Sequence, residues 1–218
     1  MKKENFLKAI QKLKASAKKR NFVQTYDLII TLKDLDLKKP ENQVNLFVQL
    51  KYPRKKVKVC AFVAPDLFEE AKKYFDKVIL VDEFDKYKDV KMQKAMTKEF
   101  DFFVAQATVM PKVATIFGKV LGRRGKMPNP KAGCVIAPGV NLKALYEKLQ
   151  RLVHISIKDA MMAQVAIGNE KMADEEVAEN GLAVYEALVH ALQNGERNIK
   201  KVLLKFTMSK PVEVEKGD

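Results

Sequence analysis

The residues best placed to do chemistry lie in the basic loop Leu121–Pro130, LGRRGKMPNP. Arg123, Arg124 and Lys126 bring three cations close together, and we expect all three to point into solvent or at phosphate. Two glycines permit tight backbone turns, and two prolines stiffen the exit from the loop. The loop lacks the GxxxxGK spacing, followed by Ser or Thr, that cradles a nucleotide. Two interpretations stay open: contact with a polyanion, or a rigid connector between a helix and a strand.

Side chains able to catalyse a reaction are few. The two histidines are His154 and His190, and none of the three serines stands in a GxSxG motif. Cys60 and Cys134 each lie in an apolar run, and no CxxC pair occurs. This pattern predicts buried, reduced thiols and neither a zinc site nor a redox pair. We therefore expect no enzyme, no metal and no cofactor.

A competing hypothesis is a nucleotide-using α/β enzyme with a basic face for an RNA substrate. Such an enzyme needs phosphate-binding glycines at the end of a strand. The first strand of the α/β region predicted below ends instead at Ala64-Pro65-Asp66. The glycines that this hypothesis requires are therefore missing from the sequence.

The charge of the chain indicates an anionic partner. The formal net charge is +14 and the pI is about 9.6, which favours nucleic acid over other partners. The charge is uneven, with +10 over residues 1–56, +7 over 57–151 and −3 over 152–218, so we expect a cationic face. No apolar run approaches the roughly 20 residues that cross a bilayer. The chain opens with a Lys-rich amphipathic helix instead of a signal core, so we expect a cytoplasmic protein without membrane contact.

The two ends of the chain share one pattern of predicted helices and strands. Apolar spacing predicts a helix over residues 3–19, and alternation predicts strands over 26–32 and 44–50. After residue 152 the pattern predicts strands over 154–157, 164–167 and 201–207, a helix over 173–193, and a loose tail after Pro211. These elements together indicate one α+β unit.

The middle of the chain repeats short apolar strands and helices. Strands are predicted over 57–64, 77–81, 102–107 and 133–137, with helices from Asp66 to Phe75, over 88–99 and 112–121, and from Asn141 to Arg151. Asp66 and Asn141 are expected to cap the first and the last of these helices. Such repeats are typical of a small doubly wound α/β domain. The predicted fold is thus a split α+β domain, residues 1–55 and 152–218, with an inserted Rossmann-like three-layer α/β domain, residues 56–151.

The basic loop resembles the signature of the large-subunit ribosomal protein L-one family, the ribosomal stalk proteins. Three further segments resemble that family in the same order: RNFVQTYD at 20–27, AIGNEKM at 166–172 and KFTMSKP at 205–211. The segment LKDLDLKKPENQ is similar to the archaeal branch. The resemblance implies the same split fold with an inserted Rossmann-like domain.

The resemblance also implies a function. Family members are structural ribosomal proteins that bind large-subunit rRNA at the mobile stalk near the tRNA exit site and assist tRNA release. Many also repress translation by binding their own mRNA. The expected partners are therefore large-subunit rRNA, the protein's own mRNA and exit-site tRNA, and the free protein is expected to be a monomer associated with ribosomes in the cytoplasm.

Carried over by position, the resemblance places RNA contacts on the split domain. They are Arg20, Phe22, Gln24, Thr25, Lys158, Asp159, Gly168, Lys171, Met172, Thr207, Met208 and Ser209. Small hydroxyl side chains suit contact with the RNA 2′-hydroxyl. The basic loop residues Arg123, Arg124 and Lys126 lie in the inserted domain, and we expect them to matter less for rRNA affinity.

Several of these positions have a second interpretation. Phe22 and Met208 could be core residues, because large apolar side chains are usually buried. Lys158-Asp159 could be an ordinary hairpin turn. Ser209 stands where the family usually has Gly, so it either strains the backbone or adds a hydroxyl contact to a sugar.

Overall fold

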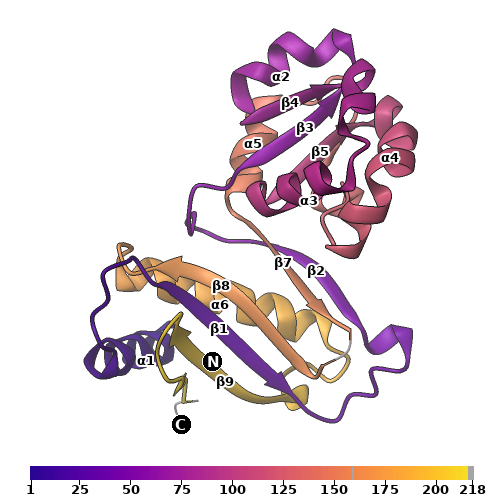
Figure 1. Cartoon of the computed structure of the whole chain (residues 1–218). Helices are drawn as coiled ribbons and strands as arrows, with labels where there is room; N and C mark the ends of the chain where they lie inside the picture. The colour runs from indigo at the N-terminus through magenta and orange to yellow at the C-terminus, as the bar shows by residue number, and fades with distance from the viewer. Residues whose placement is uncertain (159, 216–218) are drawn as a thin grey trace. The chain divides into compact units, whose positions relative to one another are not determined.

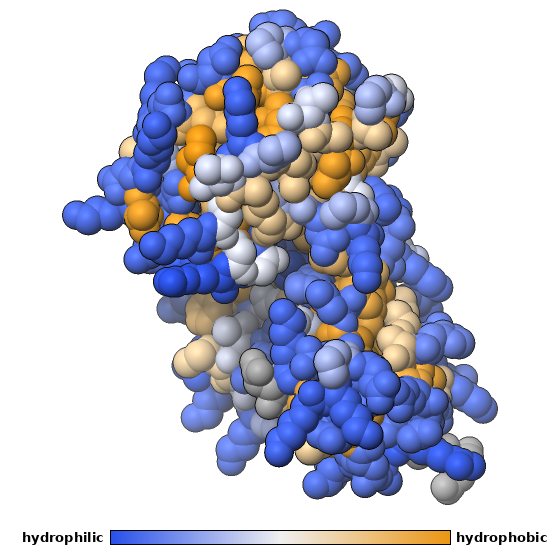
Figure 2. All heavy atoms as spheres, turned by 90° about the vertical axis from the view of Figure 1, so that its right-hand side faces the viewer, coloured by the Kyte–Doolittle hydropathy of each residue, from blue (hydrophilic) through white to orange (hydrophobic). Residues whose placement is uncertain are grey.

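The computed structural model describes residues 1–158 and 160–215 (Figure 1). Contacts divide the chain into two units: Met1–Lys55 with Arg151–Asp218, and Lys56–Gln150. Hydrophilic side chains cover much of the face drawn in Figure 2, with apolar side chains in patches between them. None of the helices in the described part of the chain combines the length and apolar character needed to span a bilayer.

The first unit is built around an antiparallel sheet. Its strand order is β10-β9-β1-β8. Two further strands, β2 and β7, pair with each other in a separate antiparallel ribbon. The elements are α1 (Lys3–Ser16), β1 (Thr25–Leu32), β2 (Val44–Gln49), β7 (Leu152–Ile157), β8 (Met162–Asn169), α6 (Asp174–Ala191), β9 (Ile199–Phe206) and β10 (Val212–Glu213).

Alternation along β1 explains the core of this unit. Tyr26, Leu28, Ile30 and Leu32 are buried, whereas the residues between them are partly exposed. Period-two burial is expected for a strand with one covered face. Helices α1 and α6 pack against each other and against the sheet. Phe6 on α1 is fully buried in the same cluster, so both chain ends contribute to one hydrophobic core.

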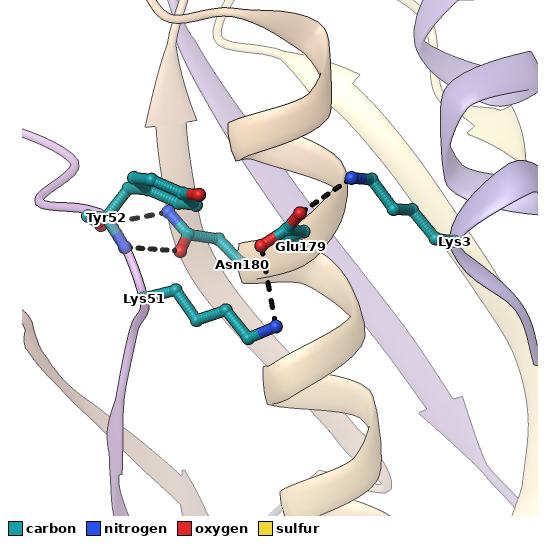
Figure 3. Close-up of polar contacts among 5 residues, drawn as sticks. All are labelled: Lys3, Lys51, Tyr52, Glu179 and Asn180. Atoms are coloured by element: carbon teal, nitrogen blue, oxygen red, sulfur yellow. Dashed lines mark hydrogen bonds and ion pairs between the residues drawn. The ribbon is translucent and has the colours of Figure 1, made fainter.

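Polar contacts join the chain ends as well (Figure 3). Glu179 on α6 accepts hydrogen bonds from the ammonium groups of Lys3 at 2.6 Å and Lys51 at 3.4 Å. The neighbouring Asn180 is fully buried and exchanges two hydrogen bonds of 3.0 Å with the backbone of Tyr52. Ion pairs as exposed as those of Glu179 contribute little to stability, because solvent screens them. The buried amide contributes more, because it also donates to the Ile167 carbonyl at 2.8 Å, and removing it would take a partner from three backbone groups.

The second unit holds a parallel sheet of strand order β4-β3-β5-β6. Strand β3 is buried along its whole length, as expected for a strand covered on both faces. Helix α3 packs on α4 and α2 packs on α5 (Figure 1). The elements are β3 (Val59–Val63), α2 (Phe68–Tyr74), β4 (Lys77–Leu80), α3 (Val90–Glu99), β5 (Phe102–Gln106), α4 (Met110–Arg123), β6 (Val135–Ile136) and α5 (Leu142–Gln150).

Two local predictions were wrong. Asp66 does not cap α2, because it lies in the 3₁₀ turn Pro65–Leu67 and its carboxylate accepts a hydrogen bond from Gln106. The chain after Pro211 is not loose as far as it is described, since β10 pairs with β9 and Val214 is buried. Strands β7 and β8 lie in different sheets; the hairpin-turn interpretation of Lys158-Asp159 includes Asp159, which lies outside the described residues.

Candidate nucleic-acid interface

Three segments far apart in the sequence meet at one corner of the four-stranded sheet. Thr25, the first residue of β1, pairs with Asn169 at the end of β8, and Tyr26 pairs with Phe206 at the end of β9. The antiparallel register therefore brings the start of β1 beside two strand ends. We call residues 20–25, 168–172 and 207–209 together the corner.

Gln24 is the centre of the corner. Its side chain is 1% exposed. The Gln24 amide donates to Glu170 Oε1 at 3.2 Å, and its oxygen accepts from the Met208 N–H at 3.2 Å. The Gln24 backbone N–H also donates to Glu170 Oε2 at 2.8 Å, and the Glu170 N–H donates back to the Gln24 carbonyl. One buried residue thus fixes the spacing of all three segments.

The segment after β9 is held by hydroxyl groups. The Thr25 N–H donates to Thr207 Oγ1 at 3.2 Å. Ser209 Oγ accepts from the Phe206 N–H at 2.9 Å and lies 3.0 Å from the Lys210 carbonyl oxygen, to which it can donate. Among the described non-glycine residues only Asp34 has a positive φ. Ser209 is therefore not strained, and its hydroxyl closes the turn.

Two large apolar side chains stand out from the corner. Phe22 is 51% exposed and Met208 is 60% exposed. The interpretation of both as core residues is therefore wrong. An exposed aromatic ring is a surface on which an unpaired base can stack. Lys18, Lys19 and Arg20, just before Phe22, are also exposed and supply the positive charge that attracts phosphate.

The turn after β8 contains packing residues and one exposed cation. Gly168 is buried, and a Cβ at this position would lie 2.9 Å from a methyl group of Val177 and 3.2 Å from the sulfur of Met172. Glycine is thus required here for the close approach of α6. Met172 packs against the core, whereas Lys171 is exposed. Lys171 is therefore the residue of this turn that presents a positive charge to solvent.

Lys158 does not join the corner. It is exposed and follows β7, before the start of β8. Met162 at that start pairs with Thr31, whereas the corner lies at the other end of β8. A strand of this length spans roughly 25 Å, so Lys158 is separated from the corner by much of the sheet. Asp159 lies outside the described residues.

Sequence reasoning missed three residues at or beside the corner. Glu170 lies inside a motif segment but was not predicted as a site residue, although it is the partner of Gln24. Asp27 and Lys205 are cross-strand neighbours on the sheet face away from the helices. Burial raises the pKa of Asp27, and the charges of Lys205 and Arg54 oppose that shift. Asp27 lies two residues after Thr25 on β1, so both side chains are on the same face of the sheet. This spacing could have identified Asp27 from the sequence.

The basic loop of the second unit has a structural explanation. The Lys126 N–H donates to the Leu121 carbonyl and the Gly125 N–H to the Gly122 carbonyl, which is the Schellman pattern that ends α4. Gly125 takes the required left-handed conformation with φ of 63°. Lys126 Nζ donates to the carbonyls of Thr97 at 2.8 Å and Phe100 at 2.7 Å.

Lys126 therefore corrects the expectation that all three cations of the loop point into solvent or at phosphate. Its ammonium satisfies carbonyl groups at the C-terminal end of α3, where the helix dipole favours a cation. Arg123 and Arg124 remain exposed. The described residues hold no group of three or more His, Cys, Asp or Glu side chains that could bind a metal ion.

Comparison with known proteins identifies the family of this chain. The model of the ribosomal protein L1p/L10e family matches residues 13–210. The large ribosomal subunit protein uL1 of Methanothermococcus thermolithotrophicus is 41% identical over 99% of this chain and 100% of its own length. The uL1 protein of Thermococcus kodakarensis is 38% identical over 98% of each chain, and that of Nanoarchaeum equitans is 41% identical over 90% of this chain and 93% of its own.

Proposed function

The chain belongs to the ribosomal protein L1p/L10e family, and we propose that the corner is its binding site for large-subunit rRNA. As a member of this family the chain is a structural, non-catalytic component of the large ribosomal subunit. As a ribosomal component it is located in the cytoplasm. The observation that carries the proposal is the convergence of three segments on the buried side chain of Gln24. A surface held this firmly meets folded RNA with little loss of conformational entropy.

The corner offers three kinds of contact that RNA uses. The exposed ring of Phe22 provides a stacking surface. Exposed cations before β1 and at Lys171 attract phosphate. Hydroxyl and backbone groups at Thr25 and Thr207 suit the 2′-hydroxyl, which distinguishes RNA from DNA. The other predicted contacts, Gly168, Met172 and Ser209, hold the shape of the surface.

We propose in addition that the first unit is a split RNA-binding α+β domain, residues 1–55 and 152–218, and that the second is an inserted Rossmann-like domain, residues 56–151. The contact division and the parallel sheet support this assignment. The family resemblance further supports a place at the mobile stalk near the tRNA exit site, assistance in tRNA release, and repression of translation through its own mRNA. It also supports a monomeric state for the protein when it is free of the ribosome.

The test is a gel-shift titration of large-subunit rRNA from Methanothermococcus thermolithotrophicus. Loss of one stacked base typically weakens binding by about tenfold, so Phe22→Ala should raise the dissociation constant by about that factor without changing the circular dichroism spectrum. Met92→Ala removes another exposed apolar side chain, in the second unit, and should leave affinity unchanged. Equal losses for both variants, or no loss for Phe22→Ala, would refute the assignment of the corner.

Competition between this rRNA and the protein's own mRNA tests the regulatory proposal. A transcript of the 5′ region of the protein's own mRNA should compete with rRNA, and Phe22→Ala should weaken both complexes to the same extent if one surface binds both. Salt should weaken both complexes as well, because phosphate contacts release counterions. An mRNA complex of unchanged affinity in the Phe22→Ala variant would mean that mRNA binds elsewhere.

A further inference from the structure

The ribbon formed by β2 and β7 has one face turned away from the core. Val48, Val153 and Ile155 are buried on its inner side. The outward side chains alternate with them, as expected for strands. We call this outward surface the ribbon face; its residues are Asn45, Phe47 and Gln49 on β2 and His154 and Ser156 on β7, each exposed or partly exposed.

An aromatic pair occupies the middle of the ribbon face. Phe47 and His154 are directly opposite each other in the ladder, and their rings stack with centroids 4.6 Å apart and planes 18° apart. His154 Nε2 lies 2.7 Å from the Asn45 side-chain oxygen. When Nε2–H donates to that oxygen, Nδ1 remains as an acceptor. Two partly exposed rings are thus held nearly parallel on neighbouring strands.

The charge around the pair is positive. Strands β2 and β7 contain no Asp or Glu. Lys158 is exposed and directly follows β7. Burial of the ring, and to a smaller extent the charge of Lys158, lower the pKa of His154. The first unit as a whole carries 23 Lys and Arg against 16 Asp and Glu, a net charge of +7.

We propose that the ribbon face is a second RNA-contact surface, on which an unpaired base stacks against the Phe47–His154 pair while Lys158 contacts a neighbouring phosphate. The inference rests on the proposed function, because it assumes that the protein binds RNA. It also gives Lys158 a role, although this residue lies away from the corner. Aromatic side chains on adjacent strands, flanked by cations, are a recurrent platform for single-stranded RNA.

RNA fits this surface better than a protein partner does. The stacked rings of Phe47 and His154 are both partly exposed and offer π surface to a planar partner, and Lys158 is an exposed cation directly after β7. The His154 Nδ1 acceptor suits a base amino group or a 2′-hydroxyl. A ligand that is both planar and anionic satisfies all three features.

The chain has no tryptophan, which gives a direct test. Phe47→Trp, Phe22→Trp and Phe68→Trp each introduce one fluorophore: on the ribbon face, at the corner, and on α2 of the second unit. Each full-length variant is titrated with Methanothermococcus thermolithotrophicus large-subunit rRNA, and folding is checked by circular dichroism. We expect the indole emission of the Phe47→Trp and Phe22→Trp variants to be quenched with the same dissociation constant, and that of Phe68→Trp to be unchanged.

The outcomes separate the two proposals. Quenching at position 22 without quenching at position 47 would overturn the ribbon inference and leave the corner intact. Quenching at neither position, together with no gel shift, would refute RNA binding itself. A second variant, Phe47→Leu, keeps an apolar side chain but removes the ring, and should weaken rRNA binding by about fivefold or more. Unchanged affinity of a folded Phe47→Leu protein would also overturn the inference.

Discussion

Replacing Gln24 by Ala should loosen the corner and weaken RNA binding without touching an exposed contact. The side chain is buried and makes two hydrogen bonds, one to the Glu170 carboxylate and one from the Met208 N–H. Alanine can make neither. Glu170 Oε1 and the N–H of Met208 would then lack these partners unless water enters, although Glu170 Oε2 would keep the bond from the Gln24 backbone N–H.

The size of the effect follows from these two bonds. A hydrogen bond to a charged group contributes about 1.5–3 kcal/mol and a neutral one about 1 kcal/mol. Gln24→Ala should therefore lower the free energy of unfolding of the first unit by about 3 kcal/mol. For a unit of about 120 residues this corresponds to a fall of about 10 °C in the melting temperature.

The assay is calorimetry combined with hydrogen exchange. The melting transition of the first unit should shift, and the peptide that contains Met208 should exchange faster than in the parent protein. Gln11→Ala is the matched control, because Gln11 is an exposed glutamine on α1 and alanine is favourable in a helix. A Gln24→Ala protein that melts within about 2 °C of the parent, where about 10 °C is expected, with unchanged exchange at Met208, would refute the role given to Gln24.

Three more predictions concern packing and titration. Lys126→Met should destabilise the second unit by about 1–2 kcal/mol in chemical denaturation, because two carbonyls near the end of α3 lose their donor, whereas Arg124→Met should have no effect. Gly168→Ala should cost about 1–3 kcal/mol through its clash with Val177, whereas Gly118→Ala, with no atom within 4 Å of the added Cβ, should cost nothing. Burial raises the pKa of Cys60 to about 12 and that of Cys134 to about 11. Both thiols should therefore resist iodoacetamide at about pH 8 until the protein unfolds, as measured by mass spectrometry. The free energy of unfolding of the second unit should also fall as the pH rises above about 9, because the thiols ionise first in the unfolded state.

Periodicity predicted most of the elements. The continuous apolar run of β3 and the alternation in β1 were predicted correctly to within two residues at each end. Asn141 caps α5 as predicted, since its side-chain oxygen accepts from the N–H groups of Lys143 and Ala144. These features depend on residues close together in the chain, which a local pattern can report.

Contacts across the chain could not be predicted in this way. Gln24 meets Glu170 and Met208, which lie 146 and 184 residues away, and no local pattern carries that pairing. Lys126 looked like a phosphate ligand because its partners, backbone carbonyls 26 and 29 residues earlier, have no signature in the sequence. The family resemblance identified the corner segments, and the structure shows which of their side chains face inward.

The long separation between Gln24 and Met208 has a consequence for synthesis. A growing chain on the ribosome cannot close the corner until residues 207–209 have emerged, because these residues form its third segment. Premature fragments and stalled products therefore lack the assembled surface. If the protein represses translation of its own mRNA through this surface, only chains that contain all three segments can act as the repressor.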